Sequence, residues 1–300
     1  MKNIKALVIG DLMLDYYKVG KVLGISPEAP VPVVLEQSEK YLLGGAANCA
    51  LNLSKLRKDI LLMGFLGSDK EGKILKDLLK DFSIKHKILF GSTPTTKKTR
   101  VISNQKQILR IDREEVLPKK ESLNLLELLD NSMTSGVEYI LISDYGKGAV
   151  HDISTYLKKF KNAKFLIDPK GSNWEKYKGA FLIKPNKKEY ELIAGKFSKK
   201  NFAHKAERIC KSLNVSNLVV TIGEKGVALF SQLEGVHFIE GKKIKVKDVT
   251  GAGDNFFAML AYGIISGLNV FQASEKANES AAKSIKLFGN GIINQYEKVF

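Results

Sequence analysis

The sequence predicts an α/β protein of three layers, in which helices cover both faces of a mostly parallel sheet. Continuous apolar runs such as 5–11 (KALVIGD) and 60–67 (ILLMGFLG) are typical of strands that are buried on both faces. These runs alternate with helical patterns such as 47–56 and 68–80, which is the order of βαβ units. The 300 residues, 44% of them hydrophobic, are enough to bury a core of this size.

The predicted elements follow one another without a linker. Strand 5–11 ends in Gly-Asp, and Ala and Leu recur at helical spacing over 47–56. Strand 60–67 leads into helix 68–80, whose N-cap we expect at Ser68 or Asp69. The alternation continues in three helix-then-strand pairs: LNLLELL and YILISD, ISTYLKKF and KFLID, and HKAERICKSL and LVVTIG. Residues 1–300 are therefore expected to form a single domain.

Two stretches, at about 16–43 and 86–113, interrupt the alternation. They contain short runs of alternating character, such as VPVVLE, TRVISN and QILRID, punctuated by prolines. Such runs favour antiparallel strands with one exposed face. We expect the two stretches to pair into one small β-sheet lid rather than to form a second domain.

The net charge of +16 allows a nucleic-acid surface but does not favour one. Only five of the 48 basic residues are arginines, the residue preferred for reading bases and phosphates. A lysine-rich solvated surface explains the charge and would also attract anionic small molecules. No apolar run approaches the length of a membrane span, and no signal peptide is evident. Cys49 and Cys210 have no motif spacing, which indicates reduced thiols in a cytoplasmic protein.

Polar residues gather where the predicted strands end. In open α/β sheets, ligands bind beyond the carboxyl ends of the strands, so these residues are candidates for a shared site. They are Asp11, Asp15, Asp69, Asp144, Asp168, Asn186, Thr221 and Gly223, together with Gly44, Gly45 and Asn48 at a helix start. Any one of the acids could instead be a helix cap.

The segment 248–263 (DVTGAGDNFFAMLAYG) carries the most specific chemistry. Backbone amides of Gly251, Ala252 and Gly253 at a helix start would form an anion hole, helped by the helix dipole. The carboxylate of Asp254 could then take a proton from a hydroxyl nucleophile while the amides stabilise a transferring phosphoryl group. The structural alternative is a tight turn followed by an acid that the dipole favours.

The same segment resembles the C-terminal signature of the ribokinase-type (pfkB) sugar kinases. Residues 43–53 (LGGAANCALNL) resemble the N-terminal signature of that family, and 186–189 (NKKE) its Asn-x-x-Glu motif. The resemblance covers essentially the whole chain. It implies a ribokinase-like αβα sandwich, ATP and Mg²⁺, a lid over the sugar and a homodimer formed through that lid. It implies no nucleic-acid or membrane partner.

The resemblance also implies a role for individual residues. Asp254 would be the base, and Gly251, Ala252 and Gly253 the anion hole. The residues implied near ATP are Asn186, Lys187, Lys188, Glu189, Thr221, Gly223, Gly226 and Asn278, with Glu189 holding Mg²⁺ through water. Those implied around the sugar are Asp15, Gly44, Gly45 and Asn48. Asp248 and Thr250 are implied as candidate ligands of a monovalent cation such as K⁺.

A narrower resemblance concerns the substrate. Residues 10–17, 25–34, 98–114, 143–150 and 168–191 are similar to the kinase half of bifunctional heptose 7-phosphate kinases. This implies phosphorylation of D-glycero-D-manno-heptose 7-phosphate at C1, giving the 1,7-bisphosphate of lipopolysaccharide precursor synthesis. Arg100 and Lys170 are the nearest candidates by motif for the distal phosphate. The motif of the nucleotidyltransferase half is absent, so the chain is either a kinase alone or a fragment.

Alternatives remain at the level of sequence. Another sugar or sugar phosphate, such as fructose 6-phosphate, ribose or a keto-sugar acid, would fit the broader family. A non-catalytic sugar- or nucleotide-binding protein on the same fold is a second alternative. Three departures also stand out: Gly24 where these heptose kinases carry Arg, Asn255 in place of a small or hydroxyl residue, and Met259 in place of a small one.

Overall fold

A nine-stranded sheet forms the centre of the molecule in the computed structural model, which describes residues 4–133, 136–151, 153–242, 244 and 248–286. Seven neighbouring strands run parallel, and β12 and β13 add an antiparallel edge. In spatial order they are β13 (Gly235–Ile239), β12 (Val227–Ser231), β11 (Asn217–Thr221), β10 (Leu182–Ile183), β9 (Lys164–Asp168), β8 (Tyr139–Ser143), β1 (Ala6–Gly10), β4 (Ile60–Gly67) and β5 (His86–Gly91).

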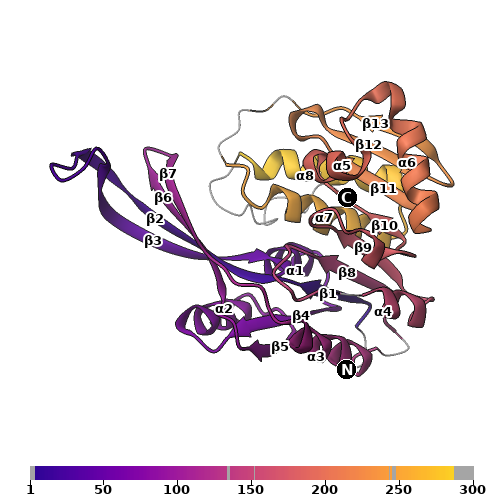
Figure 1. Cartoon of the computed structure of the whole chain (residues 1–300), viewed down its shortest axis with the longest axis horizontal. Coiled ribbons are helices and arrows are strands. Elements are labelled where there is room, and N and C mark those ends of the chain that lie inside the picture. The colour runs from indigo at the N-terminus through magenta and orange to yellow at the C-terminus, as the bar shows by residue number, and fades with distance from the viewer. Residues whose placement is uncertain (1–3, 134–135, 152, 243, 245–247, 287–300) are drawn as a thin grey trace.

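Helices cover both faces of this sheet, and each face has its own apolar core (Figure 1). One layer contains α1 (Ala46–Ser54), α2 (Lys70–Asp81), α7 (Ala252–Ile265) and α8 (Val270–Ser284). The other contains α3 (Lys119–Asp130), α4 (Ser154–Lys159), α5 (Lys187–Ala194) and α6 (Lys199–Leu213). Strand β1 shows the reason, because Ala6 and Val8 enter the first core while Leu7 and Ile9 enter the second. The predicted fold class is thus confirmed.

A separate four-stranded sheet, the lid, projects from the body (Figure 1). Its order is β3 (Pro32–Gly45), β2 (Leu12–Ile25), β6 (Thr96–Ser103) and β7 (Lys106–Arg113). The predicted start of the second excursion at residue 86 is wrong, since His86–Gly91 pairs with β4 in the central sheet. That strand lies at the sheet edge and is only partly buried, so its pattern resembles that of a lid strand.

Asp69 is a structural residue that ties the lid to the body. As the N-cap of α2, its carboxylate accepts from the Gly72 amide at 2.8 Å, as the sequence predicted. It also accepts from the Thr95 hydroxyl at 2.7 Å and from Arg113 of β7 at 2.6 Å. These contacts explain the position of Asp69 at the end of β4 without a role in ligand binding.

Within the described part of the chain, no helix combines the length and the apolar character that crossing a bilayer requires.

Candidate active site

Asp254 is buried in the first turn of α7, which begins at Ala252. The N-cap residue is Gly251, whose backbone is in the left-handed region (φ 74°). Two side chains from distant parts of the chain donate to the Asp254 carboxylate. Asn48 Nδ2 lies 2.9 Å from Oδ2, and the Tyr145 hydroxyl lies 2.5 Å from Oδ1. The predicted base is therefore held in one orientation before any substrate arrives.

Burial raises the pKa of Asp254 to about 6, although hydrogen bonds from Tyr145 and Asn48 and the charge of Lys184 act in the opposite direction. The pKa of Tyr145 is raised well above its ordinary value, first by burial and then by the neighbouring Asp254. Tyr145 therefore stays protonated, and its hydroxyl donates a hydrogen bond to Asp254. A carboxylate with a pKa just below neutrality suits a general base, because it is ionised yet more basic than a solvated aspartate.

Two helix N-termini meet at this carboxylate. Asn48 belongs to the first turn of α1, whose N-cap is Gly45 (φ 58°), and Asp254 belongs to the first turn of α7. The predicted anion hole is smaller than expected, since the Ala252 amide donates to the Val249 carbonyl at 3.2 Å. Within the described residues, the amides of Gly251 and Gly253 have no such acceptor. A Cβ at Gly253 would meet nothing within 4 Å, so there is room for an anion beside it.

A chain of buried amides continues from Asn48 into the core. The Asn52 amide donates to Asn48 Oδ1 at 3.1 Å, and the Asn255 amide donates to Asn52 Oδ1 at 3.3 Å. The Ser280 hydroxyl closes the series by donating to Asn255 Oδ1 at 2.8 Å. Asn255, one of the departures from the family signature, is thus accommodated because its polar atoms are satisfied.

The loop that carries Tyr145 is fixed by Asp11. The buried Asp11 carboxylate accepts from the amides of Tyr145, Lys147 and Ala149 at 2.7, 3.0 and 3.0 Å. Asp144 is also committed, to Lys176 Nζ and the Tyr177 hydroxyl, each at 2.5 Å. Both of these rim acids therefore shape the site without being available to a ligand.

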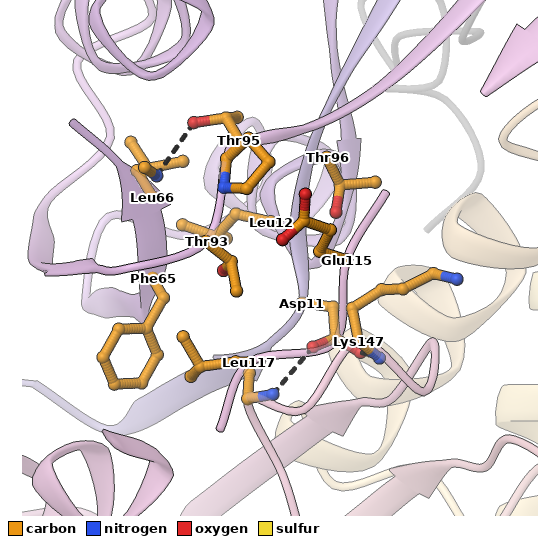
Figure 2. A pocket seen from close by; sticks show the side chains of 13 residues that line it. Asp11, Leu12, Phe65, Leu66, Thr93, Thr95, Thr96, Glu115, Leu117 and Lys147 are labelled. Atoms are coloured by element: carbon orange, nitrogen blue, oxygen red, sulfur yellow. Dashed lines mark hydrogen bonds between the residues drawn. The ribbon is translucent and has the colours of Figure 1, made fainter. Parts of the chain in front are cut away.

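A cavity of about 30 Å³ lies beside this loop, between Asp11 and Lys147 on one side and Phe65 and Leu66 on the other (Figure 2). That volume has room for a few water molecules at most and is too small for a sugar. The sugar site expected from the sequence is therefore the separate region around Asp15, Asn48 and Asp254.

On the lid side, Asp15 of β2 is buried and forms an ion pair of 2.5 Å with Arg100 of β6. The Arg100 guanidinium also lies 5.3 Å from the ring centre of Tyr17. Gly44 of β3 lies close to Asp15, and a Cβ there would approach Asp15 Oδ2 to 2.7 Å, so a side chain would collide with the carboxylate. The predicted sugar residues Asp15, Gly44 and Asn48 thus lie close together. The positive charge of Arg100 is already paired with the carboxylate of Asp15.

The Asn-x-x-Glu motif forms a capping box at the start of α5. Asn186 Oδ1 accepts from the Glu189 amide, and Glu189 Oε2 accepts from the Asn186 amide, both at 3.0 Å. The other carboxylate oxygen of Glu189 lies 3.2 Å from Lys170 Nζ. Lys170 is therefore on the side predicted for the nucleotide, which does not support its assignment to the distal phosphate of the sugar.

A buried ion pair separates the two sides. Lys184 Nζ lies 2.9 Å from Asp168 Oδ2, and both side chains are largely buried. Burial raises the pKa of Asp168 to about 7, against the attraction of Lys184. Lys184 also acts to lower the pKa of Asp254, so its charge favours the ionised form of that carboxylate.

The other residues predicted to lie near the nucleotide differ in their surroundings. Thr221 forms a bridge with Asn186, which brings β11 beside the capping box. Gly223 opens the short turn η2 (Gly223–Lys225), and a Cβ there would face open space. Gly226 is required for a different reason, because a Cβ would lie 2.0 Å from the Ile239 carbonyl. The Asn278 amide donates to the Glu240 carbonyl at 2.9 Å. Lys187 and Lys188 are exposed on α5.

Asp248 and Thr250, the predicted ligands of a monovalent cation, lie next to each other. Asp248 accepts from the Thr250 amide at 2.8 Å, which keeps the two residues together in front of α7. In the described ranges, no three His, Cys, Asp or Glu side chains are grouped as metal ligands. Glu189 has each oxygen engaged by a protein donor, so its chemistry fits contact with a metal-bound water better than direct ligation.

The fold and the site together define a phosphotransferase that acts on a hydroxyl group. A buried carboxylate stands at a helix N-terminus that can receive an anion, at the carboxyl edge of a parallel sheet and below a lid. Residues 3–295 match the model of the "pfkB family carbohydrate kinase". The chain belongs to this family and is a carbohydrate kinase, for which ATP is the phosphate donor and a divalent metal its usual companion.

Individual relatives agree with this assignment. The chain is 40% identical to the bifunctional protein HldE of Helicobacter hepaticus, over 99% of its length and 63% of the relative. It is 36% identical to the protein of the same name from Hydrogenovibrio crunogenus, over 98% and 62%. The chain thus spans less than two thirds of these relatives.

Solved structures support the fold. Phosphofructokinase-2 from Escherichia coli superposes with a TM-score of 0.79 at 17% identity, covering 94% of this chain and 92% of that one. Ribokinase from Thermotoga maritima gives 0.75 at 23% identity, covering 96% and 95%.

Sequence reasoning missed several residues of the site. Tyr145 and Lys184 were not singled out, because nothing local indicates that they reach Asp254 or Asp168. Asn52 could have been found from the sequence, because it lies one helical turn after Asn48 in an otherwise apolar helix and is therefore on the same face. Gly24 lies nine residues beyond Asp15 along β2, roughly 30 Å at the rise of a strand, and so lies outside this site.

Tyr145→Phe should move the acid limb of the pH–rate profile upward. The Tyr145 hydrogen bond lowers the pKa of Asp254, so its loss should raise that pKa and require a higher pH to ionise the base. A hydrogen bond to a charged group contributes about 1.5–3 kcal/mol, and one pKa unit is about 1.4 kcal/mol, so we expect a shift of about one to two pH units.

The measurement is kcat/KM against pH for both enzymes with the same substrates, whose phosphates then titrate identically. Wild type should lose activity as the pH falls through about 6. Tyr156→Phe, on α4, is the matched control and should leave the limb in place. An unchanged or lowered limb in Tyr145→Phe would show that Tyr145 does not tune the base.

Proposed function

We propose that this carbohydrate kinase transfers the γ-phosphate of ATP to the C1 hydroxyl of D-glycero-D-manno-heptose 7-phosphate, for lipopolysaccharide precursor synthesis. The observation that carries the proposal is the buried Asp254 carboxylate, held by Asn48 and Tyr145 beside Asp15 of the lid. The choice of sugar rests on the lid and rim segments that resemble heptose 7-phosphate kinases. We place the reaction in the cytoplasm, because both cysteines are buried free thiols.

In the proposed reaction, Asp254 accepts the proton of the anomeric hydroxyl as that oxygen attacks the γ-phosphorus. Asn48 and Tyr145 hold the carboxylate in place, so no reorientation is needed at the moment of transfer. The amides of Gly251 and Gly253 stabilise the charge of the transferring group at the α7 N-terminus. Asp15, Gly44, Gly45 and Asn48 orient the sugar.

The nucleotide is proposed to lie along Thr221, Gly223, Gly226 and Asn278. Lys170, paired with Glu189, supplies positive charge on this side. Magnesium neutralises phosphate charge when it is bound, and Glu189 would hold it through water, with Asn186 fixing the carboxylate. Asp248 and Thr250 are proposed to hold a monovalent cation such as K⁺.

A coupled assay of ADP release with a panel of sugars tests the substrate. The panel contains heptose 7-phosphate, free heptose, fructose 6-phosphate, ribose and a keto-sugar acid. We expect the largest kcat/KM for heptose 7-phosphate. A larger value for fructose 6-phosphate or ribose would refute the heptose assignment and leave the carbohydrate kinase in place.

Asp254→Asn should bind ATP nearly as well as wild type while turning over ~10²–10⁴-fold more slowly, the usual cost of losing a general base. The amide preserves shape and can still meet Asn48 and Tyr145, but it cannot take a proton. Calorimetry of ATP binding and steady-state rates separate the two effects. A variant that keeps more than about a tenth of the rate would exclude Asp254 as the base.

We propose further that the protein is a homodimer formed through its lid. Eight of the fifteen large apolar side chains that are exposed among the described residues belong to the lid or its connecting turn. They are Leu23, Ile25, Val31, Val33, Leu35, Ile108, Leu109 and Ile111. Apolar surface gathered in this way supports a protein partner, and sheet edges favour pairing with a second copy.

The double variant Ile25→Lys/Leu35→Lys should convert the dimer to a monomer, because charges would have to be buried in the interface. Light scattering after gel filtration should give twice the 33.3 kDa chain mass for wild type and the single mass for the variant. Leu233→Lys, at a 97% exposed position in the β12–β13 turn, is the control and should stay dimeric. A monomeric wild type at micromolar concentration would contradict the proposal.

A further inference from the structure

The inner face of the lid, next to the base, contains a lysine with no ion-pair partner among the described residues. Lys98 of β6 is half-buried, and its Nζ lies 5.4 Å from the ring centre of Tyr145. The hydroxyl of the same ring donates to Asp254. The ammonium thus lies against the face of the same tyrosine ring that holds the catalytic carboxylate.

The carboxylates around Lys98 are each matched by another cation. In the sheet register, Lys98 is paired with Asp15 on β2 and with Asp112 on β7. Asp15 is bonded to Arg100 at 2.5 Å, and Asp112 to Arg110 at 2.9 Å.

The third acid nearby, Glu114, is bonded to Lys147 at 2.6 Å. Lys98 itself forms no salt bridge to any described residue. Among the described residues of this face, Lys98 is therefore a positive charge that no carboxylate pairs with.

Burial lowers the pKa of Lys98, while Asp15, Asp112 and Glu114 act to raise it. A partly desolvated ammonium is costly unless an anion meets it, and contact with an aromatic face offsets only part of the cost. The position therefore suits an anion that arrives with the ligand. A phosphate fits, since it brings up to two negative charges and several acceptor oxygens.

We propose that Lys98 recognises the distal phosphate of the sugar and sets the preference for a phosphorylated substrate. The proposal rests on the proposed kinase function and identifies its specificity residue. A substrate held here presents a hydroxyl to Asp254 and its phosphate to Lys98, with the Tyr145 side chain contacting both protein groups. Arg100 and Lys170, the candidates by motif, are bonded to Asp15 and Glu189.

The test compares heptose 7-phosphate with unphosphorylated heptose in wild type, Lys98→Met, Lys98→Arg and Lys97→Met. Lys97 is the matched control, on the same strand but bonded to Glu71 at 2.6 Å; Glu71 keeps Arg113 when Lys97 is removed. The quantity measured is the ratio of kcat/KM for the phosphorylated and the free sugar. Thermal unfolding of each variant is followed in parallel.

Lys98→Met should lower the ratio at least tenfold, mainly through KM, because a charge-assisted contact is lost. Lys98→Arg should restore most of the ratio, and Lys97→Met should leave it unchanged. Lys98→Met should melt no lower than wild type, since it removes a half-buried charge that no carboxylate pairs with.

Two results would overturn the proposal and can be told apart. If wild type prefers the phosphorylated sugar and Lys98→Met keeps that preference within about twofold, the assignment of Lys98 fails while the proposed function stands. If wild type uses the free sugar as well as the phosphate, the proposed substrate fails together with the role of Lys98.

Discussion

The Asp254 carboxylate is buried, and its ionised form is favoured by hydrogen-bond donors from distant segments together with the charge of Lys184. Burial raises its pKa, and the hydrogen bonds of Asn48 and Tyr145 oppose that effect. Much of the surrounding architecture serves these two donors. The start of α1 carries Asn48, and Asp11 fixes the loop of Tyr145 through three amides. The base thus depends on the convergence of β1, α1, α7 and the loop after β8.

The lid has two chemically different parts. Near the body, its strands carry alternating acids and bases, and Asp15 and Arg100 are buried next to the base. Farther out, apolar side chains such as Ile25 and Leu35 are exposed. The contrast follows from position, because only the inner part can enclose a polar ligand, whereas the outer part projects from the body (Figure 1). One sheet therefore combines a buried polar part beside Asp254 with an exposed apolar part, which are the two features on which the proposed sugar site and the proposed dimer rest.

Several motif residues have a structural duty in addition to the role assigned to them. Asn186 and Glu189 close the capping box of α5, and Gly44 and Gly226 leave no space for a side chain. Substitutions at these positions would lower stability and activity together. Asp254, Tyr145 and Lys98 are better probes of function, because conservative replacements at these positions preserve shape while removing a charge or a hydrogen bond.

The sequence alone determined the fold class and the helix start before Asp254, and it limited the N-cap of α2 to Ser68 or Asp69, since periodicity and capping are local properties of the chain. It also predicted that strand-end residues would share one edge. Only the tertiary structure decided which of them meet. Tyr145 reaches Asp254 across 109 residues, Lys170 approaches Glu189, and the edge strand His86–Gly91 joins the central sheet instead of the lid. These pairings depend on the strand order and on burial, and a local sequence pattern predicts neither.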